Sequence, residues 1–127
     1  MTVPIFPITA TFVAICAIVM FLLIAWVGLR RGAIKALHGD ASDAALRKRI
    51  RIHGNFIETA PLVALAIWAS EAMEFPQIWL WLSVASFFLG RVLHAIWFEK
   101  TVRGIAMLFT TLPAMGLGAA ILLKLWL

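Results

Sequence analysis

Charged residues are scarce in this chain of 127 residues, since Asp, Glu, Lys and Arg together make up only 13% of it. A soluble globular domain averages about 25% charged and about 45–50% apolar residues, whereas 64% of this chain is hydrophobic. This composition excludes an ordinary water-soluble domain. We therefore expect a lipid bilayer to be the solvent for most of the molecular surface.

Cysteine and tyrosine are also almost missing, with one Cys and no Tyr. The single thiol, Cys16, cannot form an intramolecular disulfide, and no phenolic hydroxyl is present for chemistry. The net charge of +5 comes from basic residues beside apolar runs, not interleaved with aromatics on a polar face, so no nucleic-acid partner is expected. We predict no metal site, and haem ligation by His53 or His94 has no supporting motif.

Four long apolar segments fill the chain. A helix needs about 20 apolar residues to cross a hydrocarbon core of ~30 Å. The segments at residues 4–29, 50–72, 76–98 and 104–125 meet that need, which predicts an all-α fold, one domain with four transmembrane helices. The first segment, from Pro4 to Leu29, is too long and too neutral at its start for a secretory signal peptide. The second helix should begin outside the bilayer near Ala44, capped by Ser42 or Asp43.

Basic residues predict the orientation of these helices. Nine of the eleven Lys and Arg residues flank the connections after the first and third segments. They are Arg30, Arg31, Lys35, Arg47, Lys48, Arg49, Arg51, Lys100 and Arg103. Only Lys124 lies at the opposite end. The positive-inside rule then places both basic connections in the cytoplasm and both termini outside.

Several polar residues fall at membrane depth, where an ionisable side chain costs about 2.5–3.5 kcal/mol on insertion scales. On the second segment Arg51, Asn55 and Glu58 form a helical stripe about 60° wide. On the third, Ser83, Arg91 and His94 fall within about 80° of one another. Glu58 and Arg91 are expected at similar depth, so the simplest interpretation is a structural ion pair.

A second interpretation is a polar pocket open to the cytoplasm, because an ion pair needs two residues and the stripes hold more. Arginines outnumber the one carboxylate, so the ligand should be an anion or a zwitterion whose amine meets Glu58. His53 lies about 200° from Arg51 on the same helix and cannot join the pocket of its own chain. It either faces headgroups or serves a site formed with a neighbouring subunit.

Two runs of residues resemble motifs of the MAPEG family, the membrane-associated proteins of eicosanoid and glutathione metabolism. The first, RIHGNFIETAP, extends from Arg51 to Pro61, and the second, GRVLH, extends from Gly90 to His94. The residues RIHGN of the first motif and the short length of the chain look most like the family's bacterial branch. The four segments agree with the family's layout, so the resemblance covers essentially the whole chain.

This resemblance implies a homotrimer in a bacterial inner membrane, with glutathione bound between subunits near the cytoplasmic face. It implies a set of glutathione-binding residues: Arg51, His53, Asn55, Glu58, Arg91 and His94, with His53 reaching the site of the next subunit. A basic residue at the end of the first helix matches Arg30 or Arg31. The implied partners are glutathione, a lipophilic small molecule, the lipid bilayer and further copies of the chain.

Two positions depart from the family pattern. Where well-known members carry an arginine that supports the glutathione thiolate, the register from Arg91 leads to Met107. An aromatic hydroxyl seven residues after Arg91 is replaced by Phe98. Arg103, one turn before Met107, is the nearest substitute and the candidate catalytic residue.

Three functions remain open from the sequence. The first is a glutathione transferase or peroxidase acting on lipophilic electrophiles. The second is a non-catalytic binding or scaffold protein, whose stripes bind an anion or form structural ion pairs. The third, a small multidrug exporter, is disfavoured because the first segment has no carboxylate and Arg91 would repel cationic drugs.

Overall fold

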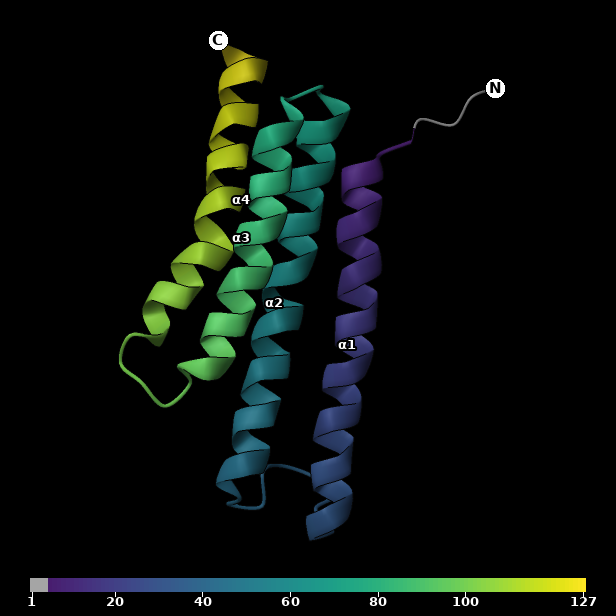
Figure 1. Ribbon diagram of the computed structural model, residues 1–127, viewed down its shortest axis with the longest axis vertical. Coiled ribbons are helices and arrows are strands. Elements are labelled where there is room, and N and C mark those ends of the chain that lie inside the picture. The colour runs from purple at the N-terminus through teal and green to yellow at the C-terminus, as the bar shows by residue number, and fades with distance from the viewer. Residues whose placement is uncertain (1–4) are drawn as a thin grey trace.

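A computed structural model describes residues 5–127 as four helices lying side by side: α1 (Pro7–Ile34), α2 (Ala44–Ala72), α3 (Gln77–Ile96) and α4 (Arg103–Trp126). The start of α1 and the end of α4 lie at one end of the bundle (Figure 1). Within the described residues no strand occurs, which confirms the predicted all-α class.

The helix bounds refine the predicted segments. The start expected at Pro4 lies outside the described residues, and α1 continues beyond Leu29 to Ile34. Helix α2 begins at Ala44 and is capped by Asp43, one of the two residues expected there. How much of each helix the bilayer covers stays a prediction.

Three helices are long and apolar enough to cross a membrane: α1, α3 and α4. Helix α2 has the length of a span, because its 29 residues rise about 43 Å, but its polar stripe lowers its mean hydropathy. It packs against α1, α3 and α4. The chain thus has the build of an integral membrane protein, with its most polar helix lying against all three of the others.

Aromatic side chains form the centre of the bundle. Phe87 of α3 packs against Phe12 of α1 at 5.0 Å and Phe56 of α2 at 5.9 Å between ring centroids. All three rings are buried. Many large apolar side chains instead lie on the outside, as expected where lipid replaces water.

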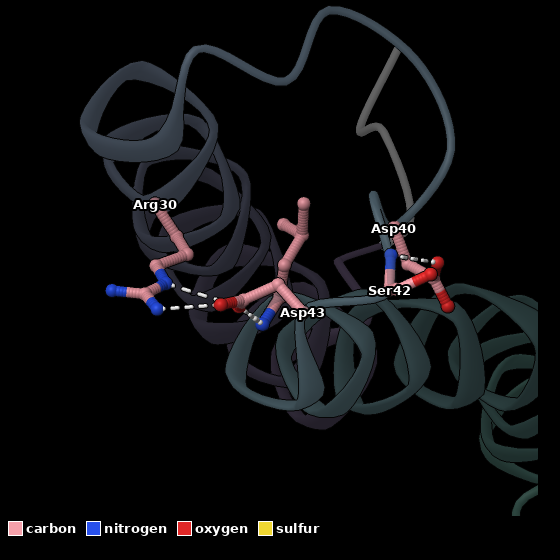
Figure 2. Close-up of polar contacts among 5 residues, drawn as sticks. Arg30, Asp40, Ser42 and Asp43 are labelled. Atoms are coloured by element: carbon pink, nitrogen blue, oxygen red, sulfur yellow. Dashed lines mark hydrogen bonds and ion pairs between the residues drawn. The ribbon is translucent and has the colours of Figure 1, made fainter.

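The first connection is held by two ion pairs, Arg30–Asp43 and Arg47–Asp40. Figure 2 shows the first of them. Asp43 accepts a hydrogen bond from the Leu46 amide at 2.6 Å and a forked pair from Arg30 at 3.1 and 2.6 Å. These donors lower the pKa of the Asp43 carboxyl to about 2. Asp40 accepts from Arg47 at 2.6 Å and from the Ser42 amide at 3.0 Å, which lowers its pKa as well.

The end of α2 and the turn after it hold the opposite end of the bundle. Glu71 accepts three hydrogen bonds from the first turn of α1: Ile8 N at 2.9 Å, Thr9 N at 2.8 Å and Thr9 Oγ1 at 2.7 Å. Lys124 of α4 donates to the Met73 carbonyl at 2.5 Å and lies over the Phe75 ring. Glu71 therefore caps α1 from another helix, where α1 has no side-chain cap of its own.

Helix α4 changes direction along its length (Figure 1), and it meets α3 closely where Gly90 faces Ala106 and Thr110. Pro113 has no N–H for the Phe109 carbonyl, and Ser86 of α3 donates to that carbonyl at 2.6 Å instead. A methyl group on Gly90 would lie 2.7 Å from the Ala106 carbonyl oxygen and 2.8 Å from Thr110 N. The missing side chain at Gly90 is what lets the two backbones meet.

Candidate functional site

Arg91, at the end of this close approach, points toward α4. Its Nε and Nη2 donate to Thr110 Oγ1 at 3.0 and 2.5 Å, and Nη2 lies 3.0 Å from the Met107 sulfur. Thr110 in turn donates to the Ala106 carbonyl at 3.0 Å. Arg91 Nη1 is buried and has no hydrogen-bond partner in the described part of the chain. One donor of this charged group is therefore left without an acceptor in the described chain.

The ion pair expected between Glu58 and Arg91 does not form. Ion pairs among residues 5–127 are confined to Arg30–Asp43 and Arg47–Asp40. Glu58 is exposed and borders a groove of about 460 Å³ between α2 and α4, with Thr111 on the other wall. The prediction is wrong for the single chain because Arg91 turns toward α4, not toward α2.

The two stripes do meet at one pair of side chains. Asn55 Nδ2 lies 3.3 Å from His94 Nε2, so the amide can donate to this ring nitrogen when it is unprotonated. His94 is only 5% exposed, and its ring packs edge-on against Phe98 at 6.0 Å. This contact fixes α2 against the end of α3.

Basic side chains surround this contact. Lys48 and Arg103 lie 5.7 and 5.8 Å from the centre of the Phe98 ring, and Arg103 Nη1 donates to the Phe98 carbonyl at 3.3 Å. Arg91 lies three residues before His94 on α3, and Arg51 lies four residues before Asn55 on α2, so each is about one helical turn from this contact. Arg103 also opens α4, whose first turn has no acidic residue, so the helix dipole adds positive potential. The arrangement attracts anions.

The predicted site residues separate into two groups. Asn55, Arg91, His94 and Arg103 gather where α2, α3 and α4 meet, with Arg51 exposed nearby. Glu58 lies beside the α2–α4 groove. His53 is partly buried, and its side chain makes no hydrogen bond among the described residues.

The sequence did not point to Thr110 or Lys48 as parts of the site. For Thr110 a signal was available: it follows Met107 by three residues and so lies on the same face of the fourth helix. Met107 was identified by register, and the structure places its sulfur against Arg91. No cluster of metal-binding side chains occurs within residues 5–127.

These features define a class: a four-helix membrane protein whose basic, partly buried polar cluster lies at the end where α2, α3 and α4 meet. A family model assigns it further. The model of the MAPEG family matches residues 9–123, and the chain belongs to that family. A search among curated proteins gives no match.

Proposed function

We propose that the protein binds glutathione at this basic cluster and acts as a membrane glutathione transferase or peroxidase on lipophilic electrophiles. The main support is Arg91, whose buried Nη1 has no partner within the described chain. A buried charged donor without an acceptor is costly, so the position favours an anionic ligand. Membership of a family associated with glutathione points to the same ligand.

Glutathione presents two carboxylates, one ammonium group and a thiol. Arg51 and Arg91 would pair with the carboxylates, and Glu58 with the ammonium. Asn55 and His94 would hold the peptide between them, and His53 would come from a neighbouring subunit. Arg103 would stabilise the thiolate, which is the nucleophilic form. The thiol releases its proton to water, the sulfur forms a bond to the electrophilic carbon, and the leaving group departs with the electron pair.

Exposed polar groups on α2 support a homotrimer with sites between subunits. Glu58 is exposed in the single chain, at a depth where a carboxylate facing lipid is costly. A neighbouring copy packed against the α2–α4 groove would cover it and bring a second chain to the cluster. Native mass spectrometry in detergent should then show three copies, and a purely monomeric protein would contradict this assembly.

Glutathione binding is tested by calorimetry with two matched threonine variants. Thr110→Val removes the acceptor that orients Arg91, whereas Thr11, near the start of α1, donates only to the Pro7 carbonyl at 2.7 Å. We expect Thr110→Val to weaken binding roughly tenfold, the usual effect of losing a hydrogen bond to a charged group. Thr11→Val should bind like the wild type. Absence of glutathione binding in the wild type would overturn the proposal.

Turnover is tested with a model electrophile. Arg103→Ala should lower kcat and raise the pH at which bound glutathione ionises, while Lys100→Ala, in the same connection, should change neither. Unchanged kinetics in Arg103→Ala would remove Arg103 from the catalytic role.

A binding protein without turnover is the second candidate. It is favoured by Phe98, which has no hydroxyl, and by Met107, whose uncharged sulfur occupies the side of α4 facing Arg91. Tight glutathione binding with no conjugation or peroxide reduction would decide for this candidate.

A further inference from the structure

An apolar groove runs between α3 and α4, in the half of the bundle away from the basic cluster. Its volume is about 560 Å³, within the range of about 300–1,000 Å³ that is usual for small-molecule sites. Its lining includes Trp79, Leu82 and Ser86 of α3 and Pro113, Gly116 and Ala120 of α4. None of the lining residues belongs to the site proposed for glutathione. We call it the α3–α4 groove.

The surface of the α3–α4 groove is apolar, although two serines line it. Ser83 donates to the Trp79 carbonyl at 2.8 Å, and Ser86 donates to the Phe109 carbonyl at 2.6 Å. Both hydroxyl protons are therefore used by backbone carbonyls, and the groove has no free hydroxyl donor for a polar ligand. A hydrocarbon suits this surface better than a polar molecule does.

The groove is open at Gly116. A methyl group built on this residue would have no atom within 4 Å. Trp79 and Leu82, which line the same groove, are 60% and 50% exposed, so they project beyond its base. Helices that pack through small residues need their backbones to approach closely. The projecting side chains hinder such an approach to Gly116, whereas a single flexible acyl chain can lie along the groove.

One end of the groove carries an ammonium group. Lys124 follows Ala120 by four residues on the same face of α4, and its Nζ lies 5.1 Å from the centre of the Phe75 ring, which also lines the groove. Lys124 donates to the Met73 carbonyl at 2.5 Å and forms no ion pair within residues 5–127. An ammonium group has three donors, so two are left for an anion.

The start of α3 adds positive potential at the same end of the bundle (Figure 1). Helix α3 begins at Gln77, two residues after Phe75, and has neither a side-chain cap nor an acidic residue in its first turn. Its first amides and its dipole therefore favour a negative group. Glu74, in the preceding turn, borders a different hollow beside the start of α1. The groove thus combines an apolar length with a positively charged end.

The depth of the groove corresponds to one leaflet. Trp79 and Trp126, at the charged end, are 60% and 80% exposed, and exposed tryptophans are typical of the headgroup level. From Lys124 to Pro113 the chain runs eleven residues, about 16.5 Å along a helix. This is about half of a hydrocarbon core of ~30 Å. A groove that extends from the headgroups to the bilayer centre has the length of one acyl chain.

We propose that the α3–α4 groove binds one acyl chain of an anionic phospholipid, in the leaflet at the end of the bundle where α4 ends. The phosphate meets Lys124 and the first amides of α3, and the chain passes over Gly116 toward Pro113. The positive-inside rule makes this the leaflet on the outer side of the membrane. The lipid and glutathione therefore occupy opposite halves of the bundle, and both can be bound at once.

The test is lipid retention by the purified full-length protein in native mass spectrometry, without glutathione. Phosphatidylglycerol and phosphatidylcholine with identical acyl chains are compared. We expect the wild type to retain phosphatidylglycerol preferentially. Lys124→Gln should reduce that retention roughly fivefold, the factor that one basic side chain supplies near an anionic surface, and should leave phosphatidylcholine retention unchanged. Lys100→Gln, which removes the same charge at the other end of the bundle, should leave both within about twofold of the wild type.

A second variant tests the groove itself. Gly116→Leu fills the open space, so retention of both lipids should fall roughly fivefold or more, as expected for an overpacked site. Leucine forms helices better than glycine does, so a misfolded α4 is not expected to cause this loss. Gly28→Leu is the control, because Gly28 is exposed on α1 and a methyl group there also has no atom within 4 Å.

Several outcomes would overturn the proposal. Equal losses of phosphatidylglycerol in Lys124→Gln and Lys100→Gln would assign the preference to diffuse charge. Unchanged lipid retention in Gly116→Leu, with fewer copies in each complex, would make the groove a contact between copies of the chain. Displacement of the lipid by equimolar glycerophosphate would show that the acyl chain has no part in binding.

Discussion

Single residues decide how α3 and α4 meet. Gly90 allows the close approach of the two backbones, and Thr110 Oγ1 accepts hydrogen bonds from Nε and Nη2 of Arg91. Ser86 donates to the carbonyl that Pro113 cannot reach with an N–H. None of these contacts is an ion pair. The Arg91 guanidinium is held by the neutral hydroxyl of Thr110 and the sulfur of Met107, so its positive charge is not neutralised by a carboxylate.

Substitution of Gly90 should therefore be costly. In Gly90→Ala the new methyl group would meet the Ala106 carbonyl oxygen and the Thr110 backbone nitrogen, neither of which can swing aside. We expect a loss of about 1–3 kcal/mol in stability, as for other overpacked sites. Thermal unfolding in detergent measures it. Gly116→Ala is the control, because nothing lies within 4 Å of its added methyl group, and equal melting temperatures for the two variants would contradict the close contact.

At the scale of elements, each end of the bundle is fixed by capping across chain segments. Asp43 caps α2 and pairs with Arg30 of α1, while Glu71 of α2 caps α1. Both carboxylates lie at helix N-termini, where the macrodipole favours negative charge. The helix ends thereby determine which helices are neighbours.

The cap at Asp43 should respond to acid. Its pKa of about 2 lies below the ordinary value of about 3.9, so its stabilisation is complete above about pH 4 and is lost as the pH falls toward 2. Protonation would release Arg30 and loosen the first turn of α2. The protection factor of the Leu46 amide, which compares its exchange with the intrinsic rate at the same pH, should fall over this interval. Asp43→Asn should remove most of the pH dependence, and an unchanged acid response in that variant would assign it to another group.

The cap at Glu71 should control the first turn of α1. In Glu71→Ala the amides of Ile8 and Thr9 lose their acceptors. Their hydrogen exchange should become faster, and the loss of protection should correspond to about 0.5–2 kcal/mol, the usual cost of a lost cap. Glu74→Ala is the matched control, because the Glu74 side chain makes no hydrogen bond within the described residues. Protection that survives in Glu71→Ala would show that the cap is dispensable.

At the scale of the whole molecule, the sequence predicted the helices more fully than their contacts. Long apolar runs, caps and turns identify helices because these signals are local. The pairing of Glu58 with Arg91 was wrong because helical angles show which residues share a face, but not which neighbour that face meets. Arg91 turns to α4, and its partner Thr110 is an ordinary helix residue in the sequence. The remote cap by Glu71 has no local signal either.

The orientation in the membrane can be tested with engineered thiols. Cys16 lies within α1, where an impermeant maleimide should not reach it, so it need not be removed. In sealed cytoplasm-inside vesicles Glu74→Cys should be labelled from outside, and Lys35→Cys only after permeabilisation. The reverse pattern would invert the predicted topology. Labelling of both without permeabilisation would show that the two ends share one side.

The end of α2 and the turn that follows it contact helices made at different times during synthesis. Glu71, in the last turn of α2, binds the start of α1, and the Met73 carbonyl of the turn receives Lys124 of α4, which comes 51 residues later in the chain. The start of α1 therefore stays uncapped until the second helix has entered the bilayer. The contact with Lys124 must wait until α4 has been made and inserted. Closure of the bundle at this end is thus a late step in assembly, because it needs the first, second and fourth helices together.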